Sequence, residues 1–163
     1  VGRPKNGGYP IRGIVKANML YLRNYEPNRW PGGNPETGYL NCDGSPTKTL
    51  LLNQRREGNT KFWQMNFGKR PTEELFYLVN DPYCVTNLAT AKSQARLKLE
   101  LSKQMESELK AQGDPRQFGN GKIFDSYPFV GSWNNFFEKY TSGEKTPGTG
   151  WVNASDYEKE PLD

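Results

Sequence analysis

An apolar run, a turn and a long amphipathic stretch follow one another between residues 75 and 112, and they constrain the fold most. Residues 75–79 are all apolar, which is typical of a strand buried on both faces. Asn80-Asp81-Pro82 then predicts a turn. Apolar residues recur after it in steps of mostly four, which predicts a helix over 89–112 with one apolar stripe against a sheet. The stripe consists of Ala91, Ala95, Leu97, Leu101, Met105 and Leu109.

The preceding part of the chain supplies further strands and shorter helices. Residues 11–24 carry β-branched and aromatic residues on both sides of Ala17-Asn18, which predicts a hairpin. Residues 25–46 are rich in Pro and Gly and predict a long loop. Ser45-Pro46 is typical of a helix start, and a helix of about ten residues is expected to Arg56. A second helix is expected from Thr60 to Phe67.

These elements predict an α+β fold, with an antiparallel sheet of about four strands and the long helix packed on it. We expect this subdomain to span residues 1–115, including the helix 89–112. Residues 116–163 carry many aromatic residues among Gly, Ser and Asn, and such a segment cannot form a core alone. It is expected to wrap over this domain or a neighbouring one. The mean hydropathy of −0.90 also favours a chain that leans on a larger structure.

Composition excludes several kinds of protein. The net charge of +4 is small, and its basic residues are too scattered for a nucleic-acid interface. No stretch reaches the length of a membrane span. The absence of histidine excludes Ser-His and Cys-His catalysis. Cys42 and Cys84 are too few for a zinc site or a disulfide scaffold, and they are either separate buried thiols or, in an exported protein, a pair.

Only a few polar residues are candidates for chemistry. Arg12 begins a predicted strand, and its guanidinium is suited to binding sulfate or carboxylate; the alternative is an ordinary ion pair. Asp114 follows the long helix, and its alternative is a turn aspartate that binds its own backbone. Paired carboxylates are also suited to acid–base work. Neighbours on a strand point to opposite faces, however, so Glu73-Glu74 is expected to be structural and to pair with Lys69 or Arg70. Asp156 with Glu158 is the second such pair.

The segment "RPTEELFYLVNDPYCVTNLA", residues 70–89, resembles the C-terminal subdomain of the sulfatase family. The family form is Glu-Leu-Tyr-Asp-Leu, a spacer with Asp-Pro, and then Asn-Leu-Ala. Here 74–78 supply the first part, with Phe76-Tyr77 in place of Tyr-Asp, and 87–89 supply the last. "YPIRGIVKANMLYLRNYEPNRWPGGNPE" and "GYLNCDGSPTKTLLL" resemble bacterial sulfatases of the heparan N-sulfatase (N-sulfoglucosamine sulfohydrolase) type. The resemblance covers about residues 2–130.

The resemblance implies an enzyme of the alkaline-phosphatase-like superfamily whose catalytic groups lie in an N-terminal domain and whose C-terminal subdomain is this chain. The family's N-terminal α/β domain carries the formylglycine, the calcium-binding aspartates, and the catalytic histidines and lysine, so Ca²⁺ and formylglycine are expected outside this chain. The "CDGSP" at Cys42 departs from the formylglycine motif Cys-x-Pro-Ser-Arg and is interpreted as a turn. In the family, positions matching Arg12 and Asp114 lie toward the sugar, and Asp43 is a further candidate contact. No catalytic or metal-binding residue is expected here.

The resemblance therefore implies that this chain is the C-terminal fragment of a periplasmic or secreted bacterial sulfatase, which hydrolyses sulfate esters or N-sulfate groups of glycan sugars such as glycosaminoglycans. The fragment would contribute a wall of the substrate pocket but not the catalytic nucleophile. The fragment begins at Val1 within a loop, so we expect its N-terminal catalytic domain to precede it; alone it should be inactive. Its partners would be that domain and a sulfated glycan sugar, without nucleic acid or membrane. The alternative is a free-standing carbohydrate-binding or interaction module without catalysis, whose tryptophans stack on sugars: Trp30, Trp133 and Trp151.

Overall fold

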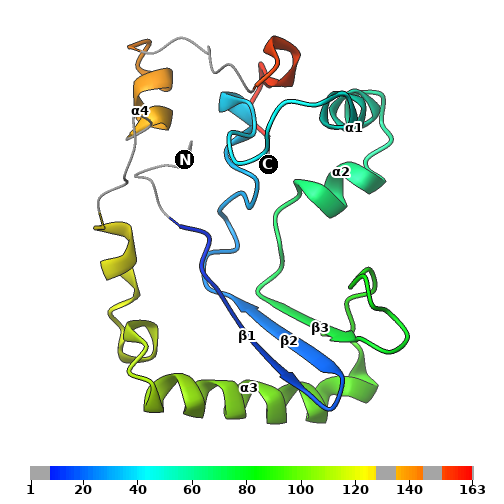
Figure 1. Cartoon of the computed structure of the whole chain (residues 1–163), viewed down its shortest axis with the longest axis vertical. Helices are drawn as coiled ribbons and strands as arrows, with labels where there is room; N and C mark the ends of the chain where they lie inside the picture. The colour runs from blue at the N-terminus through cyan, green and yellow to red at the C-terminus, as the bar shows by residue number, and fades with distance from the viewer. Residues whose placement is uncertain (1–7, 128–134, 145–151, 163) are drawn as a thin grey trace. The chain divides into compact units, whose positions relative to one another are not determined.

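The computed structural model describes residues 8–127, 135–144 and 152–162 (Figure 1). The described residues form two compact units that alternate along the chain. Unit 2 consists of Pro10–Pro27 and Pro71–Ser126, and unit 1 takes the described residues before, between and after those two segments. The predicted boundary at residue 115 remains a prediction.

Unit 2 is built on an antiparallel sheet with the strand order β1-β2-β3 (Figure 1). The strands are β1 (Ile11–Lys16), β2 (Met19–Asn24) and β3 (Glu73–Tyr77). Ala17 and Asn18 join β1 to β2 with φ values of 47° and 61°. Two left-handed residues match the twist of a two-residue hairpin, and asparagine tolerates this conformation well. The predicted hairpin is confirmed.

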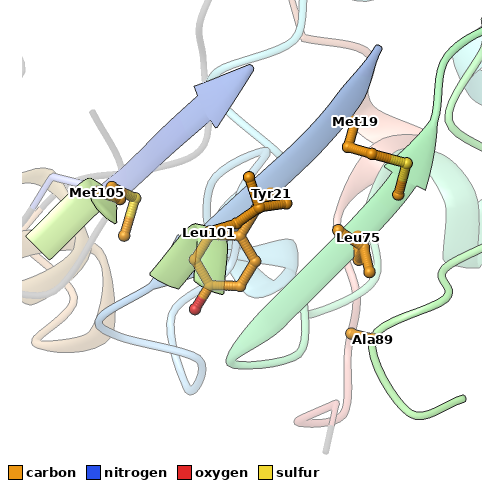
Figure 2. Close-up of a cluster of buried hydrophobic side chains, with 6 residues drawn as sticks. All are labelled: Met19, Tyr21, Leu75, Ala89, Leu101 and Met105. Carbon is orange, nitrogen blue, oxygen red and sulfur yellow. The ribbon is translucent and has the colours of Figure 1, made fainter. Parts of the chain in front are cut away.

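The helix α3 (Ala95–Ala111) lies along one face of this sheet (Figure 1). Tyr21 of β2 lies opposite Leu75 of β3, and both side chains are completely buried. They meet Leu101 and Met105, which are one turn apart on α3. Figure 2 shows the six buried side chains of this core: Met19, Tyr21, Leu75, Ala89, Leu101 and Met105.

Several predicted boundaries in unit 2 are wrong. The described residues contain three strands instead of about four, because the outer edge of β3 binds an irregular segment. There the amide of Leu88 donates to the carbonyl of Leu75 (2.8 Å), and the Asn87 side chain accepts from the amides of Leu75 and Ala89 (both 2.9 Å). These bonds tie residues 87–89 to β3, and a turn and the short 3-10 helix η3 (Lys92–Gln94) follow, so the α-helix expected over 89–112 begins six residues later, at Ala95.

The apolar run 75–79 is buried only in part. Leu75 and Phe76 are buried, whereas Tyr77 and Val79 are exposed. The strand ends at Tyr77 because its carbonyl already accepts the turn amides of Asn80 (3.2 Å) and Asp81 (2.9 Å). The prediction of a strand buried on both faces is therefore wrong for the second half of the run.

Unit 1 is formed by short helices and the long predicted loop. The helix α1 (Pro46–Arg56) begins where the sequence predicts, with the Ser45 hydroxyl accepting from the amide of Lys48 (3.1 Å). The helix α2 covers Lys61–Asn66. Further short elements are η2 (Pro35–Thr37), α4 (Phe136–Thr141) and η6 (Ala154–Asp156). The core of unit 1 consists of Tyr39, Leu52, Trp63 and Phe67.

A buried ion pair ties the C-terminal segment to α1 within unit 1. The Lys48 ammonium lies 3.4 Å from the Asp156 carboxylate, and both side chains are almost fully buried. Lys48 also donates to the backbone carbonyls of Gly38 (3.0 Å) and Cys42 (2.8 Å). A buried ammonium needs such partners, because without them its desolvation would be costly.

Candidate functional site

Arg12 and Asp114, which are 102 residues apart in sequence, meet in unit 2. Arg12 lies on the same face of β1 as Ile14, whose side chain packs against the core under α3. Its Nε donates to Oδ2 of Asp114 at 2.5 Å, and its Nη1 donates to the Ile11 carbonyl at 3.1 Å. The Arg12 side chain keeps 28% of its surface exposed, whereas Asp114 keeps 8%. Arg12 is therefore the member of the pair that presents free donors to solvent.

Asp114 owes its position to the end of α3. Gly113 adopts φ of 72° after the helix, and Asp114 then caps the short helix η4 (Pro115–Phe118). Its Oδ1 accepts from the amide of Arg116 at 2.9 Å. Burial by itself would raise the Asp114 pKa, but the Arg12 hydrogen bond and charge and the Arg116 amide and charge together hold this pKa below its ordinary value. The carboxylate is both a turn cap, as the sequence alternative proposed, and an ion-pair partner.

Three arginines and two aromatic rings alternate beside this pair, and we call the set the arginine–aromatic ladder. Its members in spatial order are Arg12, Phe124, Arg116, Tyr25 and Arg23. The guanidinium carbons of Arg12 and Arg116 lie 5.7 and 4.7 Å from the centre of the Phe124 ring. The centre of the Tyr25 ring lies 5.8 Å from the guanidinium carbons of both Arg116 and Arg23. Cation–π attraction of this kind holds guanidinium groups in place without neutralising their charge.

The three arginines of the ladder differ in their acidic partners. Arg12 pairs with Asp114, and Arg23 lies 3.5 Å from a carboxylate oxygen of Glu106. Arg116 forms no ion pair or side-chain hydrogen bond with a described residue, and its Nε is buried without a partner there. Burial lowers the Arg116 pKa, and the neighbouring charge of Arg12 lowers it further. The ladder therefore has one guanidinium whose charge is not directly compensated.

Sequence reasoning found Arg12 and Asp114 but missed Arg116 and the two rings. Arg116 stands two residues after Asp114 in "GDPR", which was the available signal. The two rings could not be recognised as ladder members from sequence, because one precedes β3 and the other follows α3. Gln117 donates to the Tyr25 hydroxyl at 2.9 Å and so fixes one of these rings.

The third predicted contact, Asp43, belongs to unit 1. It is exposed and lies in the turn before the α1 cap. The structure thus brings two of the three predicted residues together. The role of Asp43 as a sugar contact stays a prediction, as do the roles of Arg12 and Asp114.

Glu73, Asp156 and Glu158 each form an ion pair with a basic residue. Glu73 binds Lys98 of α3 at 2.7 Å and the Tyr21 hydroxyl at 2.7 Å, so the expected pairing with neighbouring basic residues is wrong for Glu73. The Lys98 hydrogen bond is the main reason why the Glu73 pKa lies below its ordinary value. In the second pair of acids each carboxylate has its own cation: Asp156 binds Lys48, and Glu158 binds Arg56.

The two cysteines and Trp30 lie apart from the arginine–aromatic ladder in sequence. Cys42 and Cys84 are free and partly buried, and burial raises the pKa of each thiol. Trp30 is half-buried and packs edge-on against Trp63, with 6.0 Å between the ring centres. Trp133 and Trp151 lie outside the described residues.

Metal ligands do not cluster in the part of the chain that the structure describes. There, no three Asp, Glu, Cys or His side chains are placed to hold a metal ion. Over the same ranges, no helix has the length and hydrophobicity needed to cross a membrane.

The comparisons with known proteins relate this chain to a sulfatase. The relative is the ulvan-active sulfatase of Formosa agariphila, with 34% identity over 121 residues, or 71% of this chain. The chain spans only 19% of the length of that relative. No protein-family model matches the chain. The heparan N-sulfatase subtype has no support in these findings.

Proposed function

We propose that this chain is the C-terminal part of a sulfatase that acts on a sulfated polysaccharide, and that it forms a wall of the substrate pocket. The sequence identity with the ulvan-active sulfatase over most of the chain carries this proposal. That relative is more than five times as long as the matched segment, which leaves ample polypeptide for a catalytic domain. If the protein that contains this chain degrades polysaccharides in a bacterium, it would be periplasmic or secreted.

The chemistry of sulfate cleavage would belong to polypeptide outside this chain. Calcium and formylglycine would be held there, and formylglycine would supply the nucleophile that attacks sulfur. This chain would bind and orient the sugar. Arg12 suits that task, because Asp114 fixes its Nε side and leaves terminal N–H donors for sugar oxygens or an anionic group. Asp114 would contribute its remaining lone pairs, and Asp43 is a further proposed contact.

The nature of the sugar is proposed at the level of a sulfated glycan. The relative's name refers to ulvan, and the resemblance in the chain's own motifs refers to heparan N-sulfatases. Parallel assays with O-sulfated and N-sulfated oligosaccharides would separate these possibilities. The alternative, a free-standing carbohydrate-binding module, would require an unrelated region or a start codon immediately before Val1.

The gene sequence upstream of Val1 provides the first test. The proposal requires a Cys-x-Pro-Ser-Arg motif with nearby Asp and His clusters there. The protein expressed with that region should hydrolyse sulfated oligosaccharides, and this 163-residue chain alone should not turn over an aryl sulfate. Turnover by the chain alone, or an unrelated upstream region, would contradict the proposal.

The second test changes Arg12 in the longer protein. Loss of a charge-assisted hydrogen bond costs about 1.5–3 kcal/mol, so Arg12→Ala should lower kcat/KM by roughly 10- to 100-fold. Lys16→Ala is the matched control, since Lys16 lies on the same face of the same strand and binds Gln104 of α3 (2.7 Å). An unchanged kcat/KM in Arg12→Ala, with the fold intact, would remove Arg12 from the proposed pocket.

A further inference from the structure

The central guanidinium of the arginine–aromatic ladder is held in place but not neutralised. Arg116 lies between the Phe124 and Tyr25 rings, and its Nε is buried. The carboxylates of Asp125, Asp114 and Glu26 favour its charge, but no ion pair or side-chain hydrogen bond joins the Arg116 side chain to a described residue. A guanidinium that has lost part of its hydration and has no bonded carboxylate is well suited to receive an anion.

The surrounding chain leaves room for this side chain. Gly121 follows on the short helix η5 (Gly121–Asp125), and a methyl group there would lie 2.9 Å from Nη1 and 3.0 Å from Cγ of Arg116. A larger residue at 121 would therefore push the guanidinium out of its position. The Asp114 carboxylate fixes the other end of the segment by accepting the Arg116 amide. Arg116 is thus positioned by its neighbours before any ligand arrives.

We propose that Arg116 binds a negatively charged group, a carboxylate or a sulfate, of a saccharide lying along the ladder, and so selects charged over neutral sugars. That the ligand is a saccharide rests on the proposed function; the anion preference rests on the ladder alone. Arg12 and Arg23 already have acidic partners, whereas the charge of Arg116 is available to the ligand. The planar guanidinium offers paired N–H donors, which match the oxygens of either anion.

The test uses this chain and three small probes: methyl glucuronide for the carboxylate, glucose 6-sulfate for the sulfate, and methyl glucoside as the neutral sugar. Binding is followed by NMR through the Nε–H signal of Arg116, which is shielded from solvent exchange by burial. At least one charged probe should shift this signal and bind about tenfold or more tightly than the neutral probe. The two charged arms show whether carboxylate or sulfate is preferred.

Three variants separate a direct role from a general effect of charge or folding. Arg116→Gln should weaken binding of the charged probe about 10- to 100-fold and leave the neutral probe unchanged. Gly121→Ala keeps the net charge but displaces the guanidinium, and it should give a similar loss. Arg96→Gln is the matched control: Arg96 is 93% exposed on α3, bound to Glu100, and its removal should change neither affinity.

Specific outcomes would overturn this inference. They are equal affinity for charged and neutral probes, no binding of any probe, or unchanged binding in Arg116→Gln. These results do not depend on what the upstream gene sequence encodes, because all five residues of the ladder belong to this chain. An upstream region without sulfatase motifs would therefore defeat the proposed function while leaving the anion preference of Arg116 to be decided by the titration.

Discussion

The buried Lys48–Asp156 pair allows the sharpest prediction about stability. Replacing Asp156 by Ala leaves a buried ammonium without its carboxylate, in a place where the Lys48 side chain is only 3% exposed. Removing one partner of a buried ion pair typically costs 3–5 kcal/mol. Lys48 keeps its backbone carbonyl partners, so the lower end of that range applies. We expect Asp156→Ala to reduce the free energy of unfolding of unit 1 by about 3 kcal/mol.

The assay follows tryptophan fluorescence during urea unfolding. Trp30 and Trp63 belong to unit 1, and the segments of unit 2 contain no tryptophan. The fluorescence midpoint therefore reports on unit 1. Glu160→Ala is the matched control, because it also removes a carboxylate from the C-terminal segment but at an exposed residue. Its effect should stay within about 0.5 kcal/mol.

A double-mutant cycle distinguishes the ion pair from lost packing. The changes are Lys48→Met, Asp156→Leu and the two combined, which replace the pair by apolar groups of similar length. Each single change should cost several kcal/mol, and the double variant should be much less unstable than their sum. A loss below about 1 kcal/mol for Asp156→Ala, or strictly additive single changes, would refute the reasoning.

Three further predictions concern unit 2. Leu101→Ala should cost about 2–5 kcal/mol by opening a cavity under the sheet, measured by the loss of helical circular dichroism in urea. Asn87→Ala should cost about 2 kcal/mol, because the amide of the buried residue Leu75 loses its acceptor, and amide hydrogen exchange at Leu75 should accelerate. The Glu73 pKa is lower in the folded than in the unfolded chain, so the stabilisation by its Lys98 bond is present above pH 4.5 and is lost as pH falls further; the stability difference between wild type and Glu73→Gln should shrink over that range.

Local patterns predicted the elements whose signals lie within a few residues. The hairpin followed from Ala17-Asn18 between two apolar runs, and the α1 start followed from Ser45-Pro46. Both depend on turn and capping chemistry that is complete in four residues. The apolar stripe of α3 likewise identified Leu101 and Met105 as core residues. These predictions needed no knowledge of distant contacts.

Predictions failed where a distant partner decides the structure. The sequence predicts a helix from residue 89, but Asn87 and Leu88 are bound to β3, so helical backbone begins only with η3 at Lys92 and the α-helix at Ala95. Glu73 was assigned to basic residues close in sequence, whereas its cation stands 25 residues away on α3. Helix periodicity and neighbouring charges cannot report such contacts, since both are measured along the chain.

The candidate site shows the same division between local and distant information. The pairing of Arg12 with Asp114 depends on where α3 ends beside β1, so each residue alone could be suspected but their contact could not be deduced. Arg116 is the stronger case, because its distinguishing property is the lack of an acidic partner among the described residues, and a missing contact leaves no pattern in a sequence. Asp114 favours the charge of Arg116, but its hydrogen bonds go to the Arg12 side chain and to the Arg116 amide, so no carboxylate is bonded to the Arg116 guanidinium among the described residues. One carboxylate thus orients Arg12 through its side chain and Arg116 through its backbone amide, and neither contact can be deduced from the places of these residues along the chain.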